Sequence, residues 1–377
     1  MTRVLGRPAP TEASVVDFDI HGLVGIRLVD PRPPDVAAVV AEIGAARISL
    51  SREPEITIQF VPELRPEGIR YVEPGETGFT DDAFFVLPPV SGKEPLAQIP
   101  LETIGRHSRI LCRSGLGSVP FLRPILNHTM LAKGVVVLHA SAFRYQGKGA
   151  LVAGWARGGK TTSLLAFMEH GAEFIADDHV YIDPVRNRIY GLPELVSLRA
   201  SHLDELPRHR RDVRRLDRAR LRGWSGLGRL AASAAVRDGR GSVGKLSGRM
   251  ARLAEDACVS IAPGRLFSRC IFEGTLDKVF LAIAHESRDV FAERVERDWL
   301  ADRLAYSLRA ERRRLMDQYL AFRFAFPNRP NDLLERASEI ERDLLVRVLA
   351  GVDAYAVYHP FPAPVGPLFE TMAPLVA

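Results

Sequence analysis

The chain has 377 residues, which is long enough for two domains with separate cores, and its formal net charge is only +5. Its three cysteines are scattered and odd in number, which excludes a disulfide framework and a paired-cysteine zinc site and is typical of a reducing cytoplasm. No apolar run approaches the roughly 20 residues that cross a bilayer, and the N-terminus lacks the apolar core of a secretion signal, so we expect a cytoplasmic protein without a membrane partner.

Residues 1–130 are predicted to form an N-terminal α+β domain. Residues 15–29 alternate apolar and polar around a turn at His21-Gly22, as a pair of strands does. Residues 33–43 predict a helix with proline near its start, and short strands are expected at residues 55–61, 68–71 and 84–87. Residues 97–104 and 110–113 continue the mixed pattern. This part carries no catalytic motif. We expect it to pack on the rest of the chain or to mediate self-association.

Residues 131–377 are predicted to form an α/β catalytic domain, introduced by a helix at residues 120–131. A core strand is expected at residues 134–143 and a buried strand at residues 150–153. The next residues, 154–161, read GWARGGKT and fit the phosphate-loop pattern G-x-x-x-x-G-K-[ST]. An amphipathic helix is expected at residues 161–168, so the loop opens onto a helix N-terminus, where the helix dipole favours anions.

The residue types of this loop suit a nucleotide triphosphate with magnesium. Backbone N–H groups would surround the phosphates, the Lys160 ammonium would reach the β- and γ-phosphates, and the Thr161 hydroxyl would bind Mg²⁺. A similar spacing at residues 239–245 lacks the final hydroxyl and a preceding strand, and we reject it. The predicted nucleotide-binding residues are Gly154, Arg157, Gly158, Gly159, Lys160, Thr161 and Thr162.

A pair of acids follows the helix. The helix is expected to end near His170-Gly171, and a short strand, 174–176, to end at Asp177-Asp178. A strand returning beside the first would bring both carboxylates to the sheet edge that holds the phosphate loop. Adjacent strand residues point to opposite faces, so one carboxylate is expected to hold Mg²⁺ and the other to accept a proton. A solvated strand end is the alternative.

The run LHASAFRYQGKGALVAGWARGGKTTSLLAFMEHGAEFIADDHVYI resembles the C-terminal catalytic domain of HPr serine kinase and its relatives. The resemblance covers about 45 residues, with a weaker continuation through residues 190–193. It implies a phosphoenolpyruvate-carboxykinase-like P-loop fold, ATP as the nucleotide, and Asp177 or Asp178 as the general base. It also implies that His139 lies behind the active site, although a lone histidine in an apolar strand is most often a core residue.

The sequence departs from that family at two places. The family loop usually reads Gly-Ser-Gly-x-Gly-Lys-Ser, whereas Trp155 and Arg157 stand in the middle here. The E-I-R-G-L-G block that supplies a metal-binding glutamate in HPr kinase is missing. Glu194, Asp204 and Glu205 lie in the corresponding region outside any matching motif. The resemblance therefore indicates a relative of HPr kinase with another acceptor.

An arginine-rich insertion is predicted at about residues 207–250. Residues 207–222 (PRHRRDVRRLDRARLR) are the most basic stretch, but acids are interspersed and no DNA-binding motif is visible, which disfavours nucleic acid as a ligand. A solvated surface helix and a surface for an acidic partner or anionic substrate stay open. Residues 223–250 are expected to form a mobile loop or lid.

The C-terminal part continues the catalytic domain. A strand is expected at residues 278–284, helices over 289–347 with a break at 327–330, a last strand at 354–358 and a proline-rich tail at 360–365. Arg265 and Arg269 are candidates to neutralise the transferred phosphate, against the alternative of ordinary surface arginines.

Together these patterns predict an ATP-dependent kinase that transfers the γ-phosphoryl group to a hydroxyl of a protein, a peptide or a small molecule. Catalytic roles are assigned to Asp177, Asp178 and His139, and Mg²⁺ to Thr161 and Asp178. One alternative is a nucleotide-gated binding protein that uses the loop without transfer. Another is pyrophosphate-linked chemistry, because the loop recognises phosphates and not bases.

Overall fold

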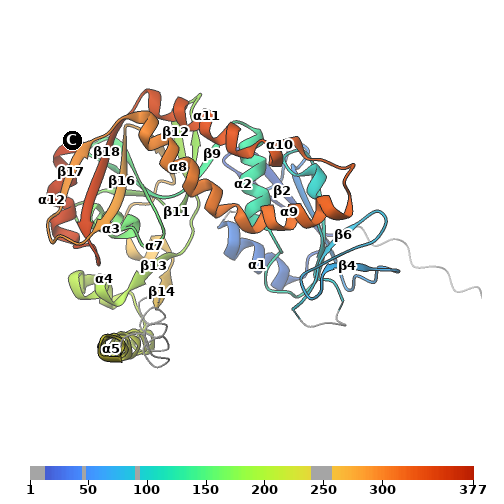
Figure 1. Cartoon of the computed structure of the whole chain (residues 1–377), viewed down its shortest axis with the longest axis horizontal. Coiled ribbons are helices and arrows are strands. Elements are labelled where there is room, and N and C mark those ends of the chain that lie inside the picture. The colour runs from blue at the N-terminus through green and yellow to red at the C-terminus, as the bar shows by residue number, and fades with distance from the viewer. Residues whose placement is uncertain (1–12, 45–47, 90–93, 239–256) are drawn as a thin grey trace, which may run out of the picture. The chain divides into compact units, whose positions relative to one another are not determined.

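The computed structural model describes residues 13–44, 48–89, 94–238 and 257–377, and it is mixed α/β with two large sheets (Figure 1). The chain divides into two compact units, residues 1–136 with 309–341 and residues 137–308 with 342–377. This division differs from the predicted domains in two respects. The helix at Leu122–Ala132, predicted to introduce the catalytic domain, belongs to the first unit. Residues 309–341 belong to the first unit, although the sequence places everything after residue 130 in one catalytic domain.

The first unit contains an eight-stranded mixed sheet in the order β1-β2-β3-β8-β7-β6-β5-β4. The hairpin β1–β2 turns through His21 and Gly22, which both have positive φ, as the turn requires. The strands are β1 (Val15–Ile20), β2 (Val24–Val29), β3 (Ile56–Val61), β4 (Arg70–Glu73), β5 (Thr77–Phe79), β6 (Phe84–Val86), β7 (Ala97–Gln98) and β8 (Ser108–Arg113). Its helices are α1 (Pro33–Ile43), η1 (Leu101–Thr103), α2 (Leu122–Ala132), α9 (Arg313–Ala325) and α10 (Asp332–Glu335).

The second unit contains the phosphate-loop sequence and a sheet in the order β15-β12-β11-β9-β10-β16-β18-β17. Strand β10 is parallel to β16, and β16 is parallel to β18, whereas β9 runs antiparallel to β10. The strands are β9 (Val136–Tyr145), β10 (Lys148–Gly154), β11 (Glu173–Asp183), β12 (Arg188–Gly191), β15 (Glu273–Thr275), β16 (Lys278–His285), β17 (Phe291–Arg294) and β18 (Asp353–Pro360). A separate pair joins β13 (Val196–Arg199) to β14 (Cys258–Ile261).

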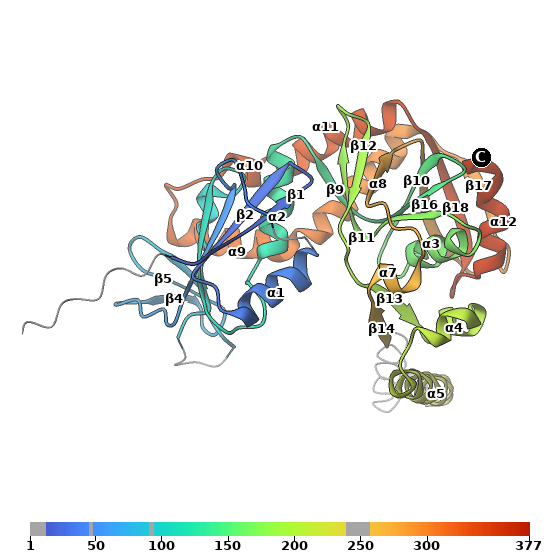
Figure 2. The ribbon, with the colours of Figure 1, turned by 180° about the vertical axis from the view of Figure 1, so that it is seen from behind.

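Helix α3 (Lys160–Glu169) follows the phosphate loop and is buried on nearly every side. The predicted helix is present, but the prediction that it is amphipathic is wrong, because both of its faces are buried. Sheet residues cover one side, and α12 (Val365–Val376) covers another, with Phe369 packed edge-on against Phe167 at 5.2 Å. Figure 2 shows α12 beside α3 from the opposite direction. Such burial fixes the helix N-terminus, and with it the loop, against the sheet.

Several elements differ from the sequence prediction. Strand β11 does not end at the acid pair but continues to Asp183. Residues 291–294 form β17 where helix was expected, and the proline-rich tail leads into α12. Residues 215–238 form the helix α5, so the first half of the predicted loop or lid is helical; its second half, 239–256, lies outside the described residues. The remaining helices are α4 (Ala200–Glu205), η2 (Pro207–Arg211), α7 (Pro263–Leu266), α8 (Arg297–Glu311) and α11 (Ala337–Ala350).

Candidate functional site

The predicted phosphate loop joins the end of β10 to the start of α3. Gly159 is the N-cap of α3 and has φ +88°, a conformation that favours glycine. A Cβ on Gly159 would also lie 2.7 Å from Nε2 of His359, so only glycine fits there. Arg157 adopts a positive φ of 65° without being glycine, at one of the positions where the sequence departs from the family loop. The local sequence thus forms the strand–loop–helix that the pattern predicts.

Lys160 is buried within this loop. Its Nζ donates hydrogen bonds to the carbonyl oxygens of Gly154 and Trp155, at 3.0 Å each. These bonds hold the ammonium against the backbone of the loop, and Lys160 itself is the first residue of α3. An ammonium and several N–H donors around one concavity attract an anion such as a phosphate group.

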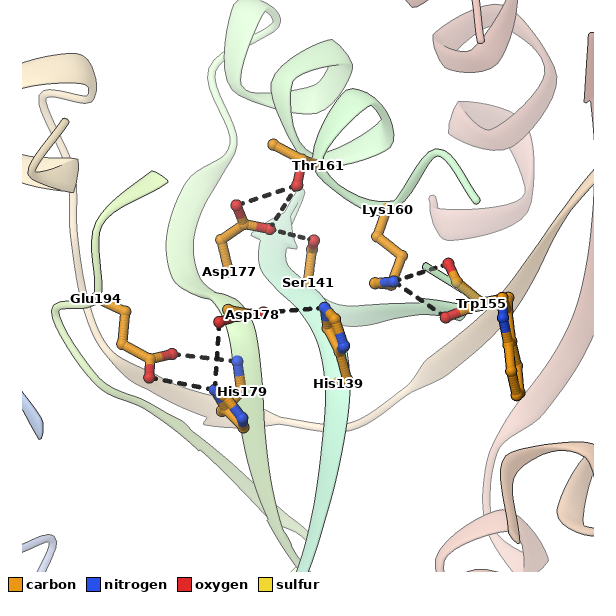
Figure 3. Close-up of polar contacts among 10 residues, drawn as sticks. His139, Ser141, Trp155, Lys160, Thr161, Asp177, Asp178, His179 and Glu194 are labelled. Carbon is orange, nitrogen blue, oxygen red and sulfur yellow. Dashed lines mark hydrogen bonds and ion pairs between the residues drawn. The ribbon is translucent and has the colours of Figure 1, made fainter. Parts of the chain in front are cut away.

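Asp177 of β11 faces the loop. The Thr161 hydroxyl lies 3.1 Å from both carboxylate oxygens of Asp177, and the Ser141 hydroxyl of β9 donates to one of them at 2.5 Å (Figure 3). Strand β11 is separated from β10 by β9, so the returning strand is not the neighbour of the first. The acid nevertheless reaches the loop because it points from the sheet toward the N-terminus of α3.

Burial raises the pKa of Asp177 to about 6, and the neighbouring Asp178 adds to this effect. The hydroxyl groups of Ser141 and Thr161, together with Lys160, oppose the rise because they favour the ionised form. A carboxylate and a hydroxyl side by side offer the hard oxygen ligands that Mg²⁺ prefers. Thr161 and Asp177 therefore fit Mg²⁺, whereas the sequence assigned the metal to Thr161 with Asp178; successive strand residues face opposite ways, and it is Asp177 that faces the loop.

Asp178 lies in a different environment from its neighbour. Its side chain is half-exposed, and its backbone φ is +89°, which turns it out of the regular strand. The ring nitrogen Nε2 of His139, on β9, lies 2.9 Å from one of its carboxylate oxygens. The structure thus brings the predicted residues His139 and Asp178 together and gives the two aspartates separate surroundings.

Two further residues extend this group: His179, which the sequence analysis did not single out, and Glu194, one of the three acids named there. Glu194 contacts both the backbone N–H and Nδ1 of His179, at 3.1 and 3.2 Å. Ligand atoms of Asp178, His179 and Glu194 all lie within 4.8 Å of one another, a donor set of oxygen and imidazole that suits Mn²⁺ or Zn²⁺. Of the three acids in the region of the missing family block, Glu194 is the one beside the aspartates. Asp204 pairs with Arg210, and Glu205 accepts from the backbone of Val365.

The phosphate loop, His139, Asp177 and Asp178 line a cavity of about 380 Å³, which we call the aspartate cavity. Its far wall comes from the pair β13–β14 and from α4, where Nε2 of His202 lies 3.0 Å from the Thr162 hydroxyl. Burial lowers the pKa of His202 to about 4, so its ring is neutral. The cavity lining consists of His139, Ala156, Arg157, Gly158, Gly159, Lys160, Thr161, Thr162, Asp177, Asp178, Leu195, Ser197, Arg199, His202 and Cys258.

His359 is a buried loop support that the sequence analysis missed. It lies on β18 and is fully buried; its Nε2 lies 3.0 Å from the carbonyl oxygen of Gly158, and its Nδ1 lies 2.8 Å from the carbonyl oxygen of Pro360. His359→Ala would leave that carbonyl buried and unpaired, so we expect a loss of about 1–3 kcal/mol in the free energy of unfolding and weaker binding of ATP. Urea denaturation and calorimetric titration measure both. His359→Gln, whose amide can donate, should recover part of each, and an unchanged ATP affinity in His359→Ala would contradict the role.

The predicted arginines lie away from the aspartate cavity. Arg265 donates to the backbone carbonyl of Asp212, and Arg269 forms an ion pair with Glu173 at the start of β11. In the arginine-rich insertion, Arg208 donates to the carbonyl of Met168 at the C-terminal end of α3. A cation at that helix end is stabilised by the helix dipole, so this arginine has a structural role.

The structure thus places a buried ammonium, two aspartates and a histidine around one cavity. Within the described ranges, no helix is long and apolar enough to cross a membrane. No known family model matches the chain, and no curated protein matches it significantly.

Proposed function

We propose that this chain is an ATP- and Mg²⁺-dependent kinase of the HPr-kinase-like group, with a phosphoenolpyruvate-carboxykinase-like catalytic unit, that transfers the γ-phosphoryl group to a hydroxyl. The observation that carries the proposal is the pairing of the loop residue Thr161 with Asp177, while the adjacent Asp178 is held by His139 at the same cavity. A loop that only binds nucleotide needs the first pair, whereas phosphoryl transfer also needs a proton acceptor, for which the half-exposed Asp178 at the same cavity is suited.

Each residue of the site has a separate role in the proposed phosphoryl transfer. Backbone N–H groups of the loop and Lys160 bind the phosphates. Thr161 with Asp177 would hold Mg²⁺, which would supply neutralising charge for the phosphates. Asp178 accepts the proton of the acceptor hydroxyl, whose oxygen bonds to the γ-phosphorus as the bond to the β–γ bridging oxygen breaks. His139 orients the Asp178 carboxylate through its Nε2 contact. The products are ADP and a phosphate monoester.

The acceptor can be found by following the label from γ-labelled ATP with Mg²⁺, in the presence and absence of lysate from the source organism. Label on a protein, peptide or small alcohol supports the proposal and identifies the acceptor class. Bound nucleotide with no label transfer in either condition overturns the kinase and favours a protein that binds nucleotide without transfer.

Lys160→Ala is expected to reduce label transfer by about 10²-fold, because it removes a buried ammonium that stabilises charge on the transferred phosphate. The matched control is Lys148→Ala, which removes an exposed lysine from the start of the same strand β10 and should leave transfer unchanged. Circular dichroism of both variants checks the fold. Full activity in Lys160→Ala would contradict the assignment of the phosphate loop.

A further inference from the structure

A second cavity, of about 610 Å³, lies against the other side of the phosphate loop; we call it the tryptophan cavity. The loop residues Ala156–Gly158 border both cavities, and all the walls of the tryptophan cavity belong to the second unit. Its lining consists of Gly154, Trp155, Ala156, Arg157, Gly158, Leu281, Ala282, Ile283, Ala284, Arg303, Leu304, Tyr306, Ser307 and Phe361. Its volume lies within the roughly 300–1,000 Å³ that is usual for small-molecule sites.

Three exposed aromatic side chains border this cavity. Trp155 is 62% exposed, Tyr306 on α8 is 65% exposed, and Phe361 after β18 is 47% exposed. A single exposed aromatic residue is common on a protein surface, but three around one concavity leave flat apolar faces open to a flat ligand. Arg303 also lines the cavity, and its guanidinium carbon lies 3.7 Å from the centre of the Trp299 ring, a contact that holds the arginine in place.

The orientation of a bound triphosphate follows from the loop. Its γ end belongs beside Thr161 and Asp177, because the metal ligands and the second aspartate lie there. Its α end must then leave the loop away from the aspartates. Figure 3 shows Trp155 on the other side of Lys160 from Asp177 and Asp178. The nucleoside attached to the α-phosphate is thereby directed toward the tryptophan cavity.

We propose, on the basis of the kinase function above, that the tryptophan cavity binds the purine base and ribose of the nucleotide, with Trp155, Tyr306 and Phe361 as its stacking surfaces. Stacking of a base on an aromatic ring contributes about 1–3 kcal/mol, and the larger purine ring gains most from it. The aspartate cavity, with His202, Arg199 and Ser197 on its far wall, is then left for the acceptor. Trp155 occupies a variable position of the pattern G-x-x-x-x-G-K-[ST], so the phosphate-loop pattern itself does not require this subsite.

The test compares ATP with inorganic tripolyphosphate, which carries the same phosphate chain without a nucleoside. Dissociation constants of both are measured by calorimetry with Mg²⁺ for the wild-type chain, for Trp155→Ala and for Ala284→Trp. The second variant fills the tryptophan cavity from an exposed position of β16 without altering the loop. The matched control is Trp224→Ala, which removes an exposed tryptophan of α5 outside this cavity.

We expect ATP to bind about 10-fold or more weakly to both cavity variants, while the affinity for tripolyphosphate stays within about twofold and Trp224→Ala changes neither. Unchanged ATP affinity in both cavity variants would overturn the nucleoside subsite and leave the kinase proposal intact. An equal loss of both ligands in both variants would overturn it too, because the loop and not the base contact would be damaged. If the wild-type chain binds neither ligand, the kinase proposal itself fails and the subsite with it.

Discussion

Asp178→Asn is expected to lower phosphoryl transfer by about 10³-fold while leaving the affinity for ATP unchanged. Asparagine has the same shape and can still meet Nε2 of His139, but its amide cannot accept the proton of an attacking hydroxyl. The side chain is half-exposed, so the substitution leaves no buried group unpaired. Single-turnover transfer from γ-labelled ATP measures the chemical step, and calorimetric titration measures binding.

The control for this experiment is Asp204→Asn, an exposed aspartate of α4 in the region where the family's metal-binding acid was sought. It should behave as the wild type in both assays. His139→Asn separates positioning from chemistry: because it removes only the group that orients Asp178, its loss should be smaller and its pH–rate profile should keep the wild-type shape. Equally mild effects of Asp178→Asn and Asp177→Asn would refute separate roles for the two acids.

The local features of the candidate site could be predicted from the sequence because each depends on a few adjacent residues. A short apolar run, a glycine-rich turn and a helix start define the loop from β10 to α3, and the structure has each of them within a few residues of the predicted bounds. The hairpin β1–β2 could be predicted for the same reason, because it depends only on the alternating pattern and the turn between its two strands. The pairings of Ser141 with Asp177 and of Glu194 with His179 depend instead on sheet order and on a loop after β12, which no local pattern encodes.

The C-terminal helix shows why other elements were missed. The sequence predicts a proline-rich tail at 360–365, but Pro364 is the N-cap of α12 and Pro367 lies in its first turn. Proline there loses no hydrogen bond, since those N–H groups have no partner within the helix. Helix α12 forms because Leu368, Met372 and Val376 bury one face against the cluster around α3. Tertiary packing here overrides local helix propensity. Strand β18, which precedes α12, carries His359, whose contact with the phosphate loop no local sequence pattern indicates.

Asp177→Asn is expected to abolish Mg²⁺-dependent transfer and at the same time to stabilise the fold at neutral pH. The pKa of Asp177 is raised from 3.8 to about 6 by burial, so its folded carboxyl binds a proton more tightly than the unfolded one. The stability that this provides is complete below pH 3.8 and is lost as the pH rises through 6, a loss of about 3 kcal/mol at one pKa unit per 1.4 kcal/mol. Asparagine stays neutral and avoids that loss.

The prediction is checked by urea denaturation without Mg²⁺ at pH 7.5 and at pH 5. Asp177→Asn should be more stable than the wild type by up to about 3 kcal/mol at pH 7.5, and the difference should shrink at pH 5, where the wild-type carboxyl is protonated in the folded state. Asp178→Asn, at a half-exposed position, should change stability little at either pH. A less stable Asp177→Asn at pH 7.5 would show that the hydroxyl groups of Ser141 and Thr161 already compensate the buried charge. A gain in stability with a loss of transfer would mean that the fold retains an ionised Asp177 at an energetic cost because the reaction requires it.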